Sequence, residues 1–287
     1  MSIDGWQYYN HAMIPTTPPH VDPNITPIEN KSIWKSVEGK TPLLARWTTD
    51  FDCGYETNWW YVIKDAPFNI DDVSAKDRKS IRQALNKCYV KKVDSKEYLD
   101  LLYDCYLEAF KKYENAEGVF DKREFIASLK NSSDCWCGFD RETNSLIGYM
   151  TVVVCDIHAE IRTARFNPLF SNKRVSDALY YHVLDYYLNE CKKEYVSSGE
   201  RSINHKSNTQ DYKMRRFGYR KAYCHLHLLY NPKFTFAVKI AFFFRKILKR
   251  LDRITLIHLI NAVLMMEELR RMDVSTINAQ DHTKNLN

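Results

Sequence analysis

The chain has 287 residues, of which 45% are hydrophobic and 27% are charged, so a packed core is possible and global disorder is excluded. This length fits one main domain with extensions at both ends. A net charge of +6 permits a phosphate-rich partner but does not require one.

The cysteines and the first residues indicate a compartment. The eight cysteines show no zinc-ligand spacing, and the only close pair is Cys135 and Cys137, which are expected to be reduced thiols on one face of a strand. Met1 to Trp6 lack the basic and apolar segments of a secretory signal. The expected location is therefore a reducing cytoplasm.

The first part of the chain, residues 1–88, reads as an N-terminal extension of the main domain. Frequent prolines between Tyr8 and Lys40 predict an extended arm, because proline interrupts both helices and sheets. Aromatic and branched residues predict strands at 43–49 and 58–64. A basic helix is expected over 74–88, with Ser74 capping its first turn.

The main domain is expected over residues 89–232. A short strand at 89–93 leads into a helix over 95–113, where apolar residues recur at helical spacing. Asp121, with Glu124 three residues later, predicts a capping box and a second helix.

Beyond that helix, the spacing at which apolar residues recur changes from 3.6 residues to two, which predicts three strands joined by tight turns. The remaining helices and strands then alternate. The expected strands are 134–140, 145–156, 158–167, 194–198 and 219–230, and the expected helices are 175–192 and 208–217, the last closed by Gly218.

In this order, residues 89–230 resemble the GNAT (N-acetyltransferase-like) acyltransferase fold. The stretch from Arg216 to Tyr219, with Gly218 between two aromatic residues, is similar to the closing motif of that family. The resemblance implies a mixed α/β (α+β) fold, whose central sheet is flanked by helices and splays open between its fourth and fifth strands. It also implies an acyltransferase that moves an acyl group from acetyl-CoA or another acyl-CoA to an amine or hydroxyl of a small-molecule or envelope-precursor acceptor.

A second resemblance leads to an alternative. The stretch from Lys76 to Leu85 is similar to the basic helix of Fem-type aminoacyltransferases, whose donor is aminoacyl-tRNA. In GNAT enzymes a glycine-rich loop at a helix start binds the pyrophosphate of coenzyme A, and residues 172–178 contain no glycine here. This favours the tRNA alternative, or a non-catalytic member that keeps the fold as a binding or membrane-associated module.

The resemblance also places candidate site residues. Glu200 and His205, just beyond a strand end, could take a proton from the acceptor, although they could equally be a solvated side chain and a helix-entry residue. Tyr212 could protonate the leaving group, because Met214 occupies the position where the family often has tyrosine. The residues expected to bind the donor are Arg162, Arg165, Phe166, Lys173, Arg174, Val175, Ser176 and Asn208.

No metal is expected, because the histidines lack a His-Glu-x-x-His spacing. Residues 233–272 are expected to form a helical extension, followed by a disordered tail over 273–287. Within 236–251, apolar residues share one helical face, and Lys239, Lys246, Lys249 and Arg250 lie opposite. This segment could contact a membrane surface, or it could pack on the main domain.

Overall fold

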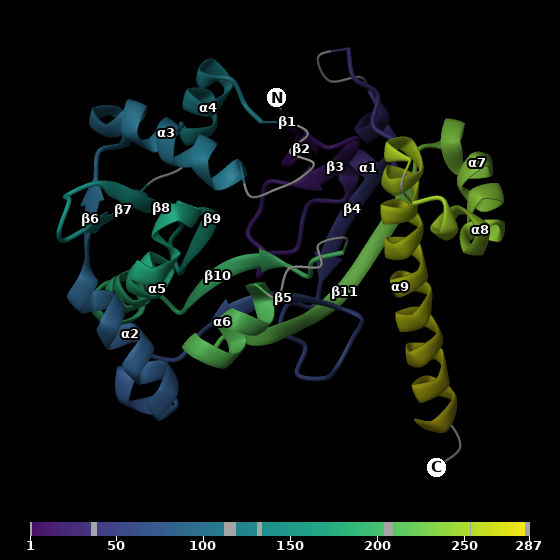
Figure 1. The fold of residues 1–287 in the computed structure, drawn as a ribbon. Helices are drawn as coiled ribbons and strands as arrows, with labels where there is room; N and C mark the ends of the chain where they lie inside the picture. Colours follow the sequence, from purple (N-terminus) through teal and green to yellow (C-terminus); the bar gives the residue numbers. More distant parts are fainter. Residues whose placement is uncertain are drawn as a thin grey trace. The chain divides into compact units, whose positions relative to one another are not determined.

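The computed structural model describes residues 2–35, 39–111, 119–130, 134–203, 209–252 and 254–284, and it divides into two compact units (Figure 1). Unit 1 comprises Met1–Tyr61, Glu200–Lys206 and Lys221–Asn287. Unit 2 comprises Val62–Gly199 and Ser207–Arg220. Each unit is thus assembled from separated stretches of sequence, whereas consecutive segments were expected from the sequence.

Unit 2 contains a mixed sheet in the order β10-β9-β8-β7-β6. Its strands are β6 (Cys88–Val93), β7 (Asp134–Asp140), β8 (Leu146–Val154), β9 (His158–Phe166) and β10 (Tyr195–Glu200). The first four are antiparallel neighbours, and β10 pairs with β9 in parallel. The order of elements from β6 onward is the one expected from the sequence, which confirms the mixed α/β class.

The main helices of unit 2 cover both faces of this sheet (Figure 1). They are α2 (Ala75–Lys87), α3 (Leu99–Phe110), α4 (Lys122–Leu129), α5 (Val175–Leu184) and α6 (Thr209–Phe217). The predicted caps are present: Ser74 accepts a hydrogen bond from the Asp77 N–H, and Asp121 and Glu124 form a capping box. Short 3₁₀ segments lie at Ile70–Asp72, Ser95–Tyr98 and Pro168–Lys173, and the π-helical segment Asp185–Glu190 continues α5.

The two faces of the sheet have different cores. On one face, Leu102 and Tyr106 of α3 pack with Phe125 of α4 and Tyr149 of β8. On the other face, α5 lies directly on the sheet at Gly138 and Gly148. The absence of side chains at these glycines allows the start of α5 to approach the strands closely.

Gly138→Ala is expected to destabilise the protein by about 1–3 kcal/mol through overpacking. A Cβ at this position would lie 2.4 Å from Cγ2 of Val175, whose branched side chain has little rotamer freedom. Urea unfolding of the two proteins measures the difference. Val175→Ala provides the control, since Gly138→Ala should cost much less in that background; an equal cost in both backgrounds would contradict the steric explanation.

Unit 1 contains strands in the order β1-β2-β3-β4-β11. They are β1 (Ser2–Ile3), β2 (Trp6–Tyr9), β3 (Ala12–Pro15), β4 (Leu44–Thr49) and β11 (Arg220–Tyr230), while β5 (Trp59–Lys64) spans the boundary between the units. Within the predicted extended arm, β2 and β3 form a hairpin whose loop residues Asn10 and His11 have positive φ, and the short helices Thr26–Glu29 and Ser32–Trp34 follow. Trp6, Met13 and Ile33 form a buried cluster.

The C-terminal part of unit 1 is helical, as expected, but its boundaries differ. It forms α7 (Pro232–Phe243), α8 (Arg245–Arg250) and α9 (Thr255–Lys284), so the single helix expected over 236–251 is interrupted at Phe244. Helix α9 runs through residues 273–284, where a disordered tail is expected; its sequence contains no proline or glycine to end it. None of the described helices has the length and apolar character needed to cross a bilayer.

Candidate functional site

Strands β9 and β10 separate partway along their length. Their parallel pairing runs from His158↔Tyr195 to Glu160↔Ser197, yet β9 continues to Phe166. Gly199 has φ +87°, a left-handed conformation that interrupts the extended path of β10 just past the last pair. The sheet of unit 2 therefore splays between its fourth and fifth strands, β9 and β10, as the resemblance in element order implied.

A cavity of about 540 Å³ lies at this splay. It is bounded by the free part of β9, the first turns of α5 and the inward face of α6. Its polar lining consists of Arg162, Arg165, Ser176, Tyr180, Ser198, Thr209, Tyr212 and Lys213. Several hydrogen-bonding groups thus converge on an opening large enough for part of an extended ligand.

Lys213 is the most unusual group in this cavity. It is only 7% exposed, its Nζ donates a hydrogen bond to Oγ of Ser198, and it lies 5.8 Å from the centre of the Tyr180 ring. Burial lowers the pKa of Lys213 to about 8, because the charged form is poorly solvated there. Near neutral pH the cavity therefore contains a mostly protonated amine that can stabilise negative charge on a bound group.

A second cavity, of about 530 Å³, adjoins the first and shares Ser176 and Tyr212 with it. Lys87 and Gln83 of α2 line one side, and Arg174 lies at the start of α5. Helix α5 begins here, and the first N–H groups of a helix attract anions. Arg174 has φ +59° at the N-cap and supplies no side-chain cap to these groups.

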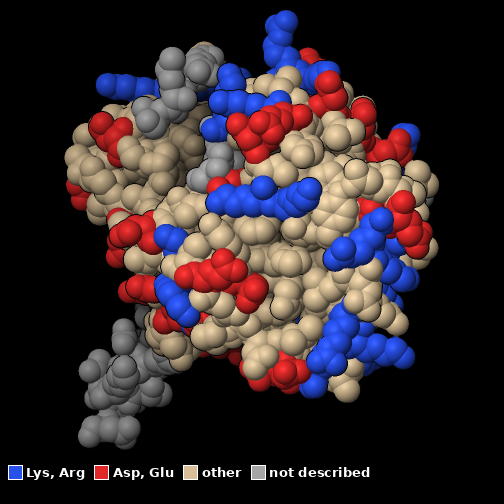
Figure 2. Space-filling view, turned by 90° about the vertical axis from the view of Figure 1, so that its left-hand side faces the viewer, with Lys and Arg blue, Asp and Glu red and all other residues tan. Residues whose placement is uncertain are grey.

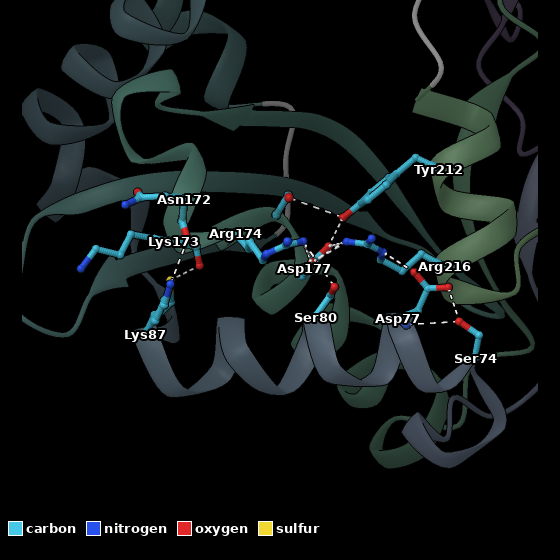
Figure 3. Close-up of polar contacts among 12 residues, drawn as sticks. Ser74, Asp77, Ser80, Lys87, Asn172, Lys173, Arg174, Asp177, Tyr212 and Arg216 are labelled. Carbon is cyan, nitrogen blue, oxygen red and sulfur yellow. Dashed lines mark hydrogen bonds and ion pairs between the residues drawn. The ribbon is translucent and has the colours of Figure 1, made fainter.

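A buried ion network fixes α6 against α2 and α5 (Figure 3). The Arg216 guanidinium donates to Asp77 at 3.0 Å and to both oxygens of Asp177 at 2.9 and 2.7 Å. Tyr212 donates its hydroxyl proton to Asp177, and Arg174 donates to Ser80 at 3.3 Å. Burial opposes ionisation of Asp77, but hydrogen bonds from Ser74 and Arg216 hold its pKa below the usual value.

The same network determines the state of Tyr212. Burial raises the pKa of Tyr212 far above its usual value, and the adjacent Asp177 carboxylate raises it further. The phenol therefore stays protonated, and its proton is directed toward Asp177. The proposed role of Tyr212 as proton donor to a leaving group requires that this hydrogen bond be exchanged.

Several residues predicted to bind a donor lie at these cavities. Arg162, Arg165, Phe166 and Ser176 line the first cavity, and Arg174 and Ser176 line the second. Arg165 lies over the Phe110 ring at 5.0 Å, and its buried Nε has no hydrogen-bond partner among the described residues. Arg162 is ion-paired with Glu160 at 3.1 Å. Their roles in donor binding remain predictions.

Two other residues predicted to bind the donor, Lys173 and Val175, are engaged in contacts within the protein. Lys173 forms ion pairs with Asp140 at 3.0 Å and Glu142 at 2.7 Å, and its side chain is mostly covered. Burial opposes ionisation of Asp140, but Lys173 and Thr143 hold the pKa of that carboxyl below its usual value. Val175 packs its side chain against Gly138. Lys173 is thus not the exposed cation that would replace a glycine loop.

Glu200, one of the two predicted bases, is not among the residues that line the cavities of unit 2. Glu200 belongs to unit 1, where its Oε1 accepts a hydrogen bond from Arg46 at 3.2 Å. The neighbouring Arg201 donates to the backbone oxygen of Asn58 and lies over the Trp60 ring at 4.3 Å. His205 and Asn208 lie outside the described residues. Within the described ranges, no group of His, Cys, Asp and Glu side chains is arranged to hold a metal ion.

Lys213 was not identified from the sequence. It lies four residues before Phe217, which is fully buried, so both side chains point to the inward face of α6. The four-residue spacing between Lys213 and a core aromatic residue is visible in the sequence, and it could have indicated that this lysine is buried. Gly218, with φ +66°, ends the helix as the expected left-handed cap.

Comparisons with known proteins bear on the fold. No protein-family model and no curated protein matches the chain by sequence. Among solved structures, FemX matches with a TM-score of 0.53 and 9% identity over 73% of this chain and 77% of that one. L-PGS from Bacillus licheniformis matches with a TM-score of 0.48 and 14% identity over 82% of each chain. The expected GNAT-like fold, with its likeness to Fem-type proteins, is thereby confirmed.

Proposed function

We propose that this protein is an acyltransferase that binds an acyl-CoA-type donor in the cleft between β9 and β10. The observation that carries the proposal is the early end of the β9–β10 pairing, which opens a cavity lined by a buried lysine. The acceptor is an amine or hydroxyl on a small molecule or an envelope precursor. A fold shared with other proteins does not establish an activity, so the proposal rests on the site itself.

The two cavities suit the two ends of such a donor. Beyond Glu160 the β9 backbone is not paired with β10, so N–H and C=O groups on this edge of β9 could pair with the amides of a pantetheine-like arm. The phosphates would then lie in the second cavity, near Lys87, Arg174 and the first N–H groups of α5. Asp177 adds negative charge there, but it is ion-paired with Arg216.

Lys213 would act on the reacting carbonyl. The acceptor nitrogen or oxygen attacks the acyl carbon and loses its proton to solvent or to a basic side chain. Negative charge then develops on the carbonyl oxygen, to which the Lys213 ammonium donates a hydrogen bond. The bond from carbon to the leaving sulfur breaks as the carbonyl re-forms, and the thiolate takes up a proton.

Donor binding is testable without knowing the acceptor. Coenzyme A, acetyl-CoA and longer acyl-CoAs are expected to raise the melting temperature, since a ligand at about 100 times its Kd stabilises by about 2.7 kcal/mol. Lys87→Ala/Arg174→Ala should weaken binding by about tenfold or more, because charge-assisted hydrogen bonds are each worth roughly 1.5–3 kcal/mol. The control is Lys76→Ala/Lys79→Ala. These two lysines are exposed on the same helix, α2, but do not line the cavity. No shift with any of these ligands would refute an acyl-CoA donor.

Aminoacyl-tRNA is the second candidate donor. It is favoured by Arg174, which has φ +59° where a glycine-containing loop would bind pyrophosphate, and by the basic helix α2, which contributes Lys87 to the second cavity. A nucleic acid would extend along α2, so Lys76→Ala/Lys79→Ala should weaken binding of tRNA and reduce its salt dependence. The same variant should leave acyl-CoA binding unchanged, which separates the two donors. Stable folding with no affinity for either donor would favour the non-catalytic reading.

A further inference from the structure

The chain concentrates its net charge in one short segment of unit 1. Residues 232–251, which include α7 and α8, contain six basic residues and no acidic residue. The whole chain has 42 basic and 36 acidic residues, so outside this segment the two are equal at 36 each. By contrast, basic and acidic side chains are interspersed on the face of the molecule drawn in Figure 2.

The same segment exposes an unusual amount of apolar surface. Phe236 and Phe243 are 75% and 78% exposed, and Ile247 is 55% exposed. Other large exposed apolar side chains follow along the chain as far as the first turns of α9. They are Ile240, Phe244, Leu251, Ile254, Leu256 and Leu259. Scattered apolar residues are common on protein surfaces, but so many large exposed apolar side chains within one short segment favour an interaction site.

Helices α7 and α8 are held against α9 by contacts that do not involve the exposed side chains of Phe236, Phe243 and Ile247. Phe242 lies between the guanidinium groups of Arg245 and Arg271, at 4.4 and 4.0 Å from its ring centre. Asn261 of α9 donates to the backbone oxygen of Leu248 at 3.1 Å. Helices α7 and α8 are therefore docked on α9 through one side, while their most apolar side chains stay uncovered by the described residues.

A groove of about 490 Å³ between α8 and α9 adds a charged pocket to this face. Three basic side chains, Arg245, Lys246 and Lys249, line the groove together with the carboxylates of Asp252 and Glu268. Leu264 and Leu269 line its apolar part. Arg245 is ion-paired with Glu268 at 3.6 Å, whereas Lys246 and Lys249 have no ion pair among the described residues. Two lysines thus remain available for an anionic group beside exposed hydrocarbon.

We propose that α7, α8 and the start of α9 bind the surface of an anionic lipid bilayer. Phe236, Phe243 and Ile247 would enter the boundary between headgroups and acyl chains, and Lys246 and Lys249 would contact anionic headgroups at the groove. Basic residues beside a wide apolar face are the combination that interfacial helices use. A partner protein surface could match the apolar part, but the absence of any acidic residue from residues 232–251 favours lipid phosphates.

Co-sedimentation with vesicles tests this proposal on the full chain. Wild type should bind vesicles of equal parts phosphatidylcholine and phosphatidylglycerol more tightly than vesicles of phosphatidylcholine alone, and binding should weaken in about 0.5 M salt. Lys246→Glu/Lys249→Glu should lose about 30-fold or more, given the contribution of each basic residue near an anionic surface. Phe236→Ser/Phe243→Ser should lose about 100-fold, roughly tenfold per side chain removed from lipid.

A matched control is Lys76→Glu/Lys79→Glu, which makes the same change at the same spacing on α2 and should bind vesicles as wild type does. All the altered side chains are exposed, so melting temperatures should change little, and acyl-CoA binding should persist in the variants of α7 and α8. No sedimentation, or equal loss in the control, would overturn the proposal. It would also be overturned if the chain ignored vesicles but formed a dimer that Phe236→Ser/Phe243→Ser abolished.

Discussion

Wild type is expected to gain about 3 kcal/mol of stability relative to Lys213→Met as the pH rises from about 8 to about 10.5. The pKa of Lys213 is about 8 in the folded protein, against about 10.5 for a lysine in the unfolded chain. Between these values the unfolded chain holds a proton that the folded chain has released, so raising the pH favours the folded state. Each unit of pKa difference corresponds to about 1.4 kcal/mol, and the gain is complete near pH 10.5.

Below about pH 8, Lys213 is protonated in both the folded and the unfolded protein. The free-energy cost of burying the ammonium then no longer changes with pH and is at its largest. Lys213→Met should therefore be more stable than wild type near neutral pH by up to that cost, less the lost hydrogen bond to Ser198. Urea unfolding at several pH values, with exposed Lys79→Met as the control, measures the difference. Parallel stability curves for wild type and Lys213→Met would show that the lysine is solvated.

The same titration links Lys213 to the proposed chemistry. Loss of the ammonium should slow acyl transfer by about 10²–10³-fold, as for removal of one oxyanion donor. Activity of the wild type should also fall as the pH rises through about 8, because the neutral amine is a weaker donor. A rate unaffected by Lys213→Met, in a variant that still binds donor, would remove this residue from the reaction.

Local sequence signals predicted the elements that depend on short-range interactions. The capping box of Asp121 and Glu124, the helical spacing around Leu102 and the left-handed cap at Gly218 each involve residues within a few positions, and all are present. The resemblance in element order then predicted the splay beside β9.

The surroundings of the site residues depend on contacts between distant parts of the chain. Lys173 pairs with Asp140, and Lys213 contacts Ser198 and Tyr180, and no local pattern indicates these partners. The hairpin of β2 and β3 was likewise missed, because the prolines around it dominate the local composition. The splay of the sheet could thus be predicted from the order of elements, but the buried lysine beside it could not.

Arg216→Met is expected to destabilise the protein by about 3 kcal/mol. The Arg216 guanidinium is ion-paired with two buried carboxylates, Asp77 of α2 and Asp177 of α5. Removing one partner of a buried ion pair leaves an uncompensated charge, which typically costs about 3–5 kcal/mol. Urea unfolding near neutral pH measures the loss, and Arg215→Met, an exposed arginine one residue earlier on α6, should cost less than about 0.5 kcal/mol.

Two further measurements distinguish electrostatics from packing. The folded-state pKa of Asp77 is lowered, so the stability that Arg216 gives through this carboxylate is present above about pH 4 and is lost as the pH falls further. The difference between wild type and Arg216→Met should therefore narrow in acid. Adding Asp177→Asn to Arg216→Met should recover part of the lost stability, because the orphaned charge is removed. Two results would contradict the electrostatic explanation: a stability difference between wild type and Arg216→Met that does not change with pH, and a full additional cost of Asp177→Asn. Arg216 would then act through packing, and Phe217 rather than the ion network would hold α6 in place.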